Sequence, residues 1–85
     1  MSRLEKEIER LKSKPKDYTY DEAKSLLNKL GFFEYNKGKT SGSRVEFKDQ
    51  YGRKMTLHKP HPSNIIKIYK VNDLLNELKE WGLIK

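Results

Sequence analysis

Two histidines and a nearby arginine are the side chains of this chain best suited to acid–base chemistry on a phosphate ester. Arg44 opens an alternating stretch that ends at Lys48, and His58 lies in a second alternating stretch, residues 53–59. His61 follows between two prolines. Histidine exchanges protons near neutral pH, and the arginine fork matches phosphate oxygens and stays charged. Breaking a phosphate ester without a metal needs these functions: a base for the attacking hydroxyl, an acid for the leaving oxygen and a cation for the extra charge.

The two alternating stretches predict a β-hairpin that positions these groups. In each stretch apolar side chains alternate with charged or polar ones, so one face is apolar and the other charged. Because paired residues share a face, two registers remain open. One pairs Phe47 with Met55 and sets Arg44 opposite His58, and the other is slipped by two residues. Either register predicts His58 on the same face as Arg44.

Ordinary structural roles compete with the chemical ones. His58 is also explained as an exposed polar-face residue, and His61 as a loop residue between prolines. Arg44 is also explained as a surface partner of Glu46 or Asp49. Surface ion pairs contribute about 0–1 kcal/mol, so stability alone accounts poorly for Arg44.

The segment before the first alternating stretch is rich in glycine, hydroxyl and lysine residues, which favours phosphate contact. Its Gly38-Lys39-Thr40 is not a P-loop, because the earlier glycine is missing and a strand follows. A single His-x-x-His without a partner carboxylate is poor support for a metal, so we expect no metal and no cofactor. The predicted RNA contacts are Lys37, Lys39, Ser43, Arg44, Lys54 and Lys59.

Composition agrees with a polyanion as partner. The 85 residues make one domain with a net charge of +7, and residues 31–64 hold seven basic and three acidic groups. A basic sheet surface favours RNA or an acidic protein, and plain solubility explains the charge equally well. The chain has no cysteine, no apolar run of membrane-spanning length and no signal-type N-terminus, so we expect a cytoplasmic protein with no membrane partner.

Helical patterns flank the hairpin. Residues 3–12 carry an apolar stripe that either packs on the domain or docks against a partner helix. A capping box formed by Thr19 and Glu22 opens a second helix, which ends at Gly31. A further stripe ends at Gly82, and residues 59–69 read as an irregular connection with one helical turn.

Residues 32–35 predict a first strand, so the fold is α+β: a three-stranded antiparallel sheet with two helices on one face, plus an N-terminal amphipathic helix. We assign Phe33, Phe47 and Trp81 to the core. Tyr35 and Tyr51 are candidates for stacking on bases.

Four features resemble the HicA toxins of bacterial toxin–antitoxin pairs, over about residues 16–84. They are the helix end Leu30-Gly31-Phe32, the strand Gly42-Ser43-x-Val45-x-Phe47, the proline–histidine segment after the third strand, and the closing Trp81-Gly82-Leu83-Ile84. The resemblance implies an αβββα fold like that of double-stranded RNA-binding domains, over residues 14–85. Residues 1–13 would then be an N-terminal helical extension.

The resemblance also implies a ribosome-independent mRNA endonuclease neutralised by a cognate HicB-like antitoxin. The family pattern places a catalytic histidine directly after Gly-Ser, and Arg44 stands at that position. His58 is then the candidate for proton transfer, with Arg44 for phosphate stabilisation. His61 aligns approximately with the family's histidine after the third strand and is the alternative base. A non-catalytic RNA-binding module and an antitoxin-binding domain remain the alternative functions.

Overall fold

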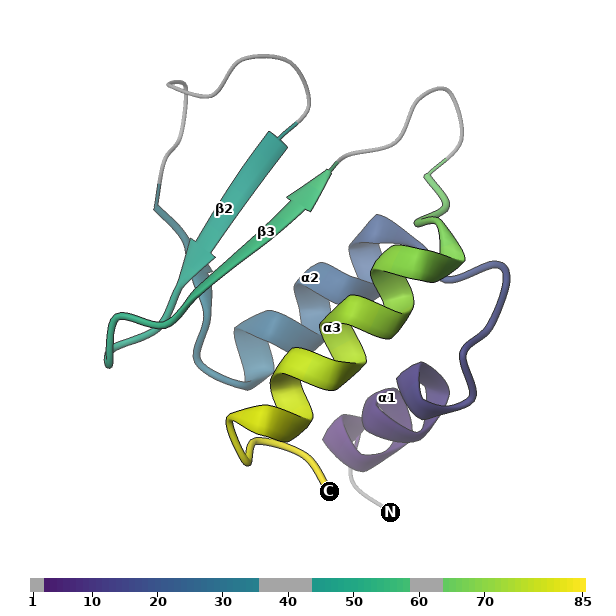
Figure 1. The fold of residues 1–85 in the computed structure, drawn as a ribbon, viewed down its shortest axis with the longest axis horizontal. Coiled ribbons are helices and arrows are strands. Elements are labelled where there is room, and N and C mark those ends of the chain that lie inside the picture. The colour runs from purple at the N-terminus through teal and green to yellow at the C-terminus, as the bar shows by residue number, and fades with distance from the viewer. Residues whose placement is uncertain (1–2, 36–43, 59–63) are drawn as a thin grey trace.

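The computed structural model describes residues 3–35, 44–58 and 64–85, and the predicted α+β fold is confirmed there. The elements are α1 (Arg3–Lys12), α2 (Tyr20–Lys29), β1 (Phe33–Glu34), β2 (Arg44–Lys48), β3 (Lys54–His58) and α3 (Ile68–Glu80). The strands form an antiparallel sheet in the order β1-β2-β3. Helices α2 and α3 lie together on one side of the sheet (Figure 1).

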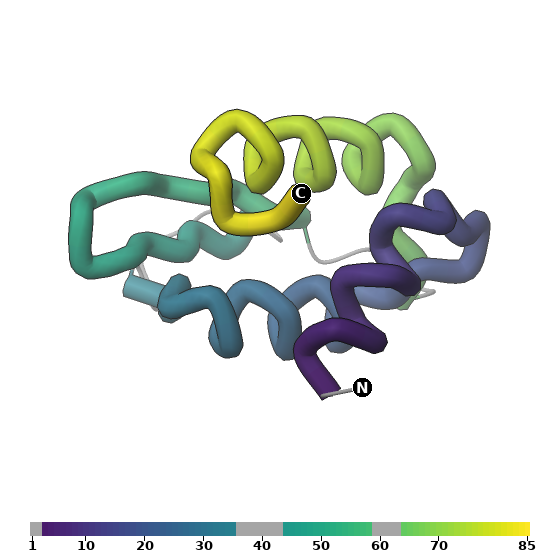
Figure 2. The backbone as a smooth tube through the Cα atoms, turned by 90° about the horizontal axis from the view of Figure 1, so that it is seen from below, coloured from purple at the N-terminus to yellow at the C-terminus, as the bar shows by residue number. Residues whose placement is uncertain are grey.

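Helices α2 and α3 run in the same direction (Figure 2), and a contact joins them at each end. Before their first turns, Thr19 and Ile65 form an antiparallel β-bridge. After their last turns, the rings of Phe32 and Trp81 stack with centroids 5.5 Å apart and planes 20° from parallel. The two-helix layer is therefore fixed by backbone pairing at one end and by aromatic contact at the other.

Glycines end both helices in the way that the sequence predicts. Gly31 has φ +96°, and its N–H donates to the Asn28 carbonyl at 3.1 Å. The N–H of Phe32 donates to the Leu27 carbonyl at 2.8 Å, which completes a Schellman motif. Gly82, with φ +73°, ends α3 by the same pattern of bonds. Each motif turns the chain back, so that the residues after the helix pack against the core.

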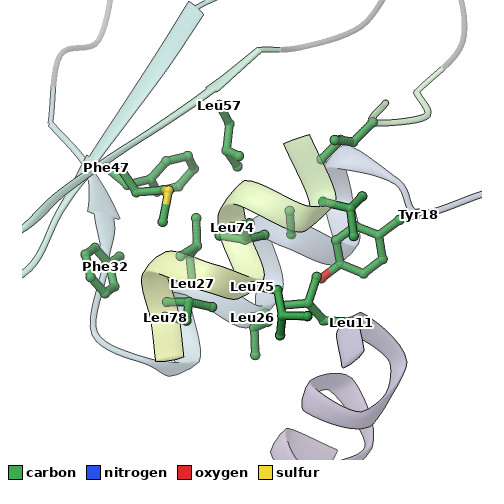
Figure 3. Close-up of a cluster of buried hydrophobic side chains, with 14 of the residues drawn as sticks. Leu11, Tyr18, Leu26, Leu27, Phe32, Phe47, Leu57, Leu74, Leu75 and Leu78 are labelled. Carbon is green, nitrogen blue, oxygen red and sulfur yellow. The ribbon is translucent and has the colours of Figure 1, made fainter. Parts of the chain in front are cut away.

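The core lies between the sheet and the helix pair, and Figure 3 shows Phe47 and Leu57 of the sheet directed toward the leucines of α2 and α3. Phe47 is fully buried, and Trp81 is partly buried against the core, as assigned. The assignment of Phe33 to the core is wrong. Phe32 is fully buried, whereas Phe33 is 58% exposed. The Schellman motif directs the residue after Gly31 inward, so its neighbour faces out.

Helix α1 packs on the domain instead of presenting its apolar stripe to solvent. Two ion pairs join it to α2: the Arg10 guanidinium with the Glu22 carboxylate, and Glu7 with Lys29 at 2.7 Å. The apolar contacts to the core come from Leu4, Ile8 and the fully buried Leu11. Of the two predicted roles for this stripe, packing is therefore the one observed.

The connection before α3 is shorter than predicted. Residues 64–67 are irregular apart from the bridge at Ile65, and α3 begins at Ile68. Ile68 and Tyr69 therefore belong to the helix, while residues 59–63 lie outside the described ranges.

Candidate nucleic-acid interface

The register of the β2–β3 hairpin brings the two predicted reactive side chains together. Phe47 pairs with Met55, and Arg44 pairs with His58. This is the first of the two registers that the sequence allows. Directly opposed residues in an antiparallel pair have Cβ atoms about 4.5–5.5 Å apart. Arg44 and His58 are both exposed, so a ligand on this surface can reach both side chains.

These two residues belong to a surface that we call the open face, the side of the sheet turned away from α2 and α3 (Figure 1). The ladder defines its members, because paired residues share a face and successive residues alternate. Within the described ranges, cations of the open face outnumber the carboxylate by three to one. The members are Phe33, Tyr35, Arg44, Glu46, Lys48, Lys54, Thr56 and His58.

A buried carboxylate in the β2–β3 turn holds this register. Asp49 is only 7% exposed, and its Oδ1 accepts the N–H groups of Tyr51 at 3.0 Å and Arg53 at 2.8 Å. The Arg53 guanidinium donates to Oδ2 at 2.6 Å. Desolvation acts to raise the pKa of Asp49, but the hydrogen bonds and charge of Arg53 outweigh it, and the pKa is lowered. A charged, fully bonded Asp49 fixes the length of the turn and hence the partner of every residue in the hairpin.

Asp49 is also one of the two ordinary partners that the sequence offers for Arg44. Its carboxylate is engaged by Arg53 instead, at the opposite end of the hairpin from Arg44. No salt bridge of Arg44 is found within the described ranges. The arginine therefore stands exposed on a cationic surface, as a phosphate contact requires.

Three of the predicted site residues lie in the described ranges, and the ladder puts all three on one face: Arg44, Lys54 and His58. Arg44 and His58 form the row at one end of the hairpin, and Lys54 lies beside the turn. The other candidates lie outside the described residues: Lys37, Lys39, Ser43, Lys59 and His61. In the sequence, these five occupy the segments that adjoin Arg44 and His58.

The predicted RNA contacts leave out one cation of the open face, although alternation places it on that face. Lys48 is exposed and pairs with both Phe33 and Lys54. Its Nζ lies 5.6 Å from the ring centroid of Tyr35. The alternation that places Lys54 on this face places Lys48 there as well, so the signal was present in the sequence. Tyr51, the other candidate for stacking on bases, lies in the turn. It is 74% exposed, and the Arg53 guanidinium lies 5.2 Å from its ring centroid.

Neither a metal site nor a membrane-spanning helix is found in the part of the chain that the structure describes. Within the described ranges, no group of three or more histidine, aspartate or glutamate side chains is arranged to hold a metal ion. None of the helices described there is long and apolar enough to cross a membrane.

Comparison with known proteins identifies the family. The family model of the HicA toxin of bacterial toxin–antitoxin systems matches residues 20–83, which include the whole sheet and the α2–α3 pair. The chain belongs to this family and is the toxin component of a toxin–antitoxin pair, whose partner is an antitoxin. Searches of curated proteins and of solved structures found no significant match.

Two of the motifs that resemble the family have a structural role in this fold. Leu30-Gly31-Phe32 and Trp81-Gly82-Leu83 form the two Schellman motifs and supply the stacked rings of Phe32 and Trp81. They hold α2 and α3 together beneath the sheet. In the motif of β2, Val45 and Phe47 also pack on the core, whereas the variable positions between them, Arg44 and Glu46, lie on the open face.

Proposed function

We propose that the toxin binds mRNA on the open face and cleaves it as a metal-independent endoribonuclease. The observation that carries the proposal is the pairing of Arg44 with His58 on an exposed, cationic sheet surface. An arginine and a histidine directly opposite each other supply the charge and the proton transfer that phosphodiester cleavage needs.

In the proposed reaction a 2′-hydroxyl loses its proton to a histidine, and its oxygen attacks the adjacent phosphorus. The bond from phosphorus to the 5′-oxygen breaks, and that oxygen takes up a proton from a protonated histidine. A 2′,3′-cyclic phosphate and a 5′-hydroxyl result, so atoms and charge balance without a metal or an oxidant. Arg44 stabilises the extra charge on the phosphorane through its fork. His58 acts in proton transfer, with His61, from outside the described residues, as the alternative base.

The test is RNA cleavage by purified protein in EDTA, comparing wild type with His58→Ala and with the double variant His58→Ala, His61→Ala. We expect His58→Ala to abolish cleavage. Full activity in the double variant would refute the mechanism while leaving a nuclease possible. Lys79→Ala is the matched control for the surface change, because Lys79 is exposed on α3.

Induced expression in a bacterial host tests the same proposal in cells. Wild type should arrest growth and deplete transcripts, and the double histidine variant should not. We also propose that the antitoxin is HicB-like and that both proteins act in the cytoplasm. Co-purification with the product of the adjacent reading frame tests the first of these.

One observation favours a second function. Arg44 occupies the position at which the family pattern has its histidine, so a non-catalytic RNA-binding module on the same face is the alternative. It predicts salt-sensitive RNA binding with no cleavage at high protein concentration. If RNA fails to bind even at low salt while the antitoxin complex forms, the cationic face serves the antitoxin alone.

A further inference from the structure

The edge strand β1 and the residue that follows it expose two aromatic rings on the open face. Phe33 is 58% exposed and Tyr35 is 43% exposed. Phe33 pairs with Lys48, so both lie on the same face. The N–H of Tyr35 donates to the Glu46 carbonyl at 3.2 Å, which continues the β1–β2 ladder past the end of the assigned strand.

Core packing does not account for Phe33. The neighbouring Phe32 fills the core position and stacks on Trp81, while Phe33 has no place in the buried cluster. An exposed phenylalanine on an edge strand gains little from folding. Edge strands with exposed apolar side chains also risk pairing with other chains. A ring held in this position is better explained by a ligand that covers it.

Charge indicates which ligand covers these rings. The ladder row that begins at Phe33 continues through Lys48 to Lys54, so one lysine lies beside the ring and a second lies one strand further along the row. The ammonium of Lys48 is also 5.6 Å from the ring centroid of Tyr35. Single-stranded RNA presents flat bases and regularly spaced phosphates, and proteins bind it by stacking aromatics on bases beside a cationic groove. In a duplex the bases are stacked on each other and are not free to contact such rings.

We propose that Phe33 and Tyr35 form a base-stacking subsite for single-stranded RNA, with Lys48 and Lys54 holding the adjacent phosphates. This inference rests on the proposed RNA binding. It assigns the preference for single-stranded over duplex RNA to one part of the open face. Phe33 is level with Lys48, four residues along β2 from Arg44, or about 14 Å at about 3.4 Å per residue, and Tyr35 is level with Glu46, nearer to Arg44. The RNA bound there would therefore extend several nucleotides beyond the phosphate at Arg44.

Binding of a fluorescein-labelled 2′-O-methyl oligouridine of ten nucleotides tests the subsite by fluorescence anisotropy, since such RNA has no free 2′-hydroxyl and resists cleavage. The variant is Phe33→Leu, Tyr35→Leu, which keeps apolar bulk and removes both rings. Tyr69→Leu is the matched control, because Tyr69 is 62% exposed on α3. A 2′-O-methyl RNA duplex of equal length is the second ligand. Trp81 fluorescence checks that each variant is folded.

We expect the double variant to bind the single strand at least about tenfold more weakly, with the duplex and the control variant unchanged. Unchanged binding of the single strand by the double variant, with weaker binding by Arg44→Ala, would overturn the subsite and leave the proposed function standing. An absence of RNA binding by wild type at low salt would instead remove the proposed function itself. If the double variant loses only its complex with the antitoxin, the rings serve a protein partner and the inference is wrong.

Discussion

Arg44 lies directly opposite His58 across the β2–β3 ladder, at the end of the hairpin farthest from its turn. Asp49 sets this pairing from the other end, because its carboxylate bonds the turn N–H groups and the Arg53 side chain. A structural carboxylate at one end of the hairpin thus determines which residues meet at the other. The Arg44–His58 pair also adjoins, in sequence, the segments that hold the predicted site residues outside the described ranges.

Arg44→Lys separates charge from geometry at this position. Lysine keeps the positive charge but loses the planar fork that contacts two phosphate oxygens at once. We expect the variant to bind non-cleavable RNA within about threefold of wild type and to cleave RNA at least about tenfold more slowly, because the fork acts on the phosphorane. Single-turnover cleavage in EDTA and fluorescence anisotropy measure the two quantities.

Arg44→Ala is the companion variant, and Lys79→Ala the control with the same loss of one charge. Arg44→Ala should weaken RNA binding and reduce its dependence on salt by about one phosphate contact. Equal cleavage rates for Arg44→Lys and wild type would contradict a specific role for the guanidinium.

Alternation along the strands was sufficient to predict the face of each hairpin residue, but not the register. Both registers satisfy the rule that apolar residues share a face, and they differ only in the length of the turn. The choice depends on Asp49, which is buried and bonds the side chain of Arg53, four residues later. The pattern of apolar residues does not reveal this contact. The fold class and the placement of Arg44 with His58 were therefore predictable, while their direct pairing was one of two possibilities.

The error at Phe33 has a different physical cause. Strand β1 has two residues, so a period of two carries no statistical weight there. The glycine that ends α2 held the missing signal, because the residue after a Schellman glycine commonly packs back on the helix. Phe32 is that residue, and Phe33 must then face the other way. The same rule would have placed Phe33 among the candidates for ligand contact.

The neighbouring phenylalanines should respond in opposite ways to truncation. Phe32 is fully buried, so Phe32→Ala should lower the free energy of unfolding by about 3–5 kcal/mol. Phe33→Ala should change it by less than about 0.5 kcal/mol, because its side chain faces solvent. Urea denaturation followed by circular dichroism measures both. A large loss for Phe33→Ala would mean that its ring packs within the molecule.

Gly82→Ala tests the Schellman motif that ends α3. Gly82 has φ +73°, and a Cβ placed there meets no atom within 4 Å, so the cost is conformational and not steric. We expect a loss of about 1–2 kcal/mol in the free energy of unfolding. Gly82→Asn should lose less, since asparagine tolerates the left-handed region. If the alanine and asparagine variants were equally stable, the left-handed backbone conformation at residue 82 would not be the cause of the lost stability.

The Arg10–Glu22 pair predicts a pH-dependent contribution to stability. The hydrogen bond from Arg10 lowers the pKa of Glu22, against desolvation and with help from the Thr19 N–H. A lowered carboxyl pKa in the folded state adds stability above the unfolded value, and this is lost as pH falls through the folded value. At pH 7 we expect Glu22→Gln to cost about 1 kcal/mol, because the pair is partly exposed and screened.

That difference should shrink as the pH falls below the ordinary glutamate pKa of 4.5 and should vanish only below the lowered value. Urea denaturation at a series of pH values measures it. Glu9→Gln is the control, because Glu9 is exposed on the same helix as Arg10. If the difference in free energy of unfolding between wild type and Glu22→Gln stayed constant over the whole acidic range, the charge of Glu22 would not contribute to stability.

Helix α1 lies outside the residues that match the family model, yet its packing predicts that the domain depends on it. Leu11 is fully buried in the common core, so Leu11→Ala should cost about 2–5 kcal/mol. Lys12→Ala, at the next position, removes a side chain that is not fully buried and should cost little. Because Leu11 shares the core with α2 and α3, unfolding should remain one cooperative transition, monitored by Trp81 fluorescence and circular dichroism together. Two separate transitions, or a small loss for Leu11→Ala, would instead show that α1 is attached loosely and that residues 14–85 fold without it.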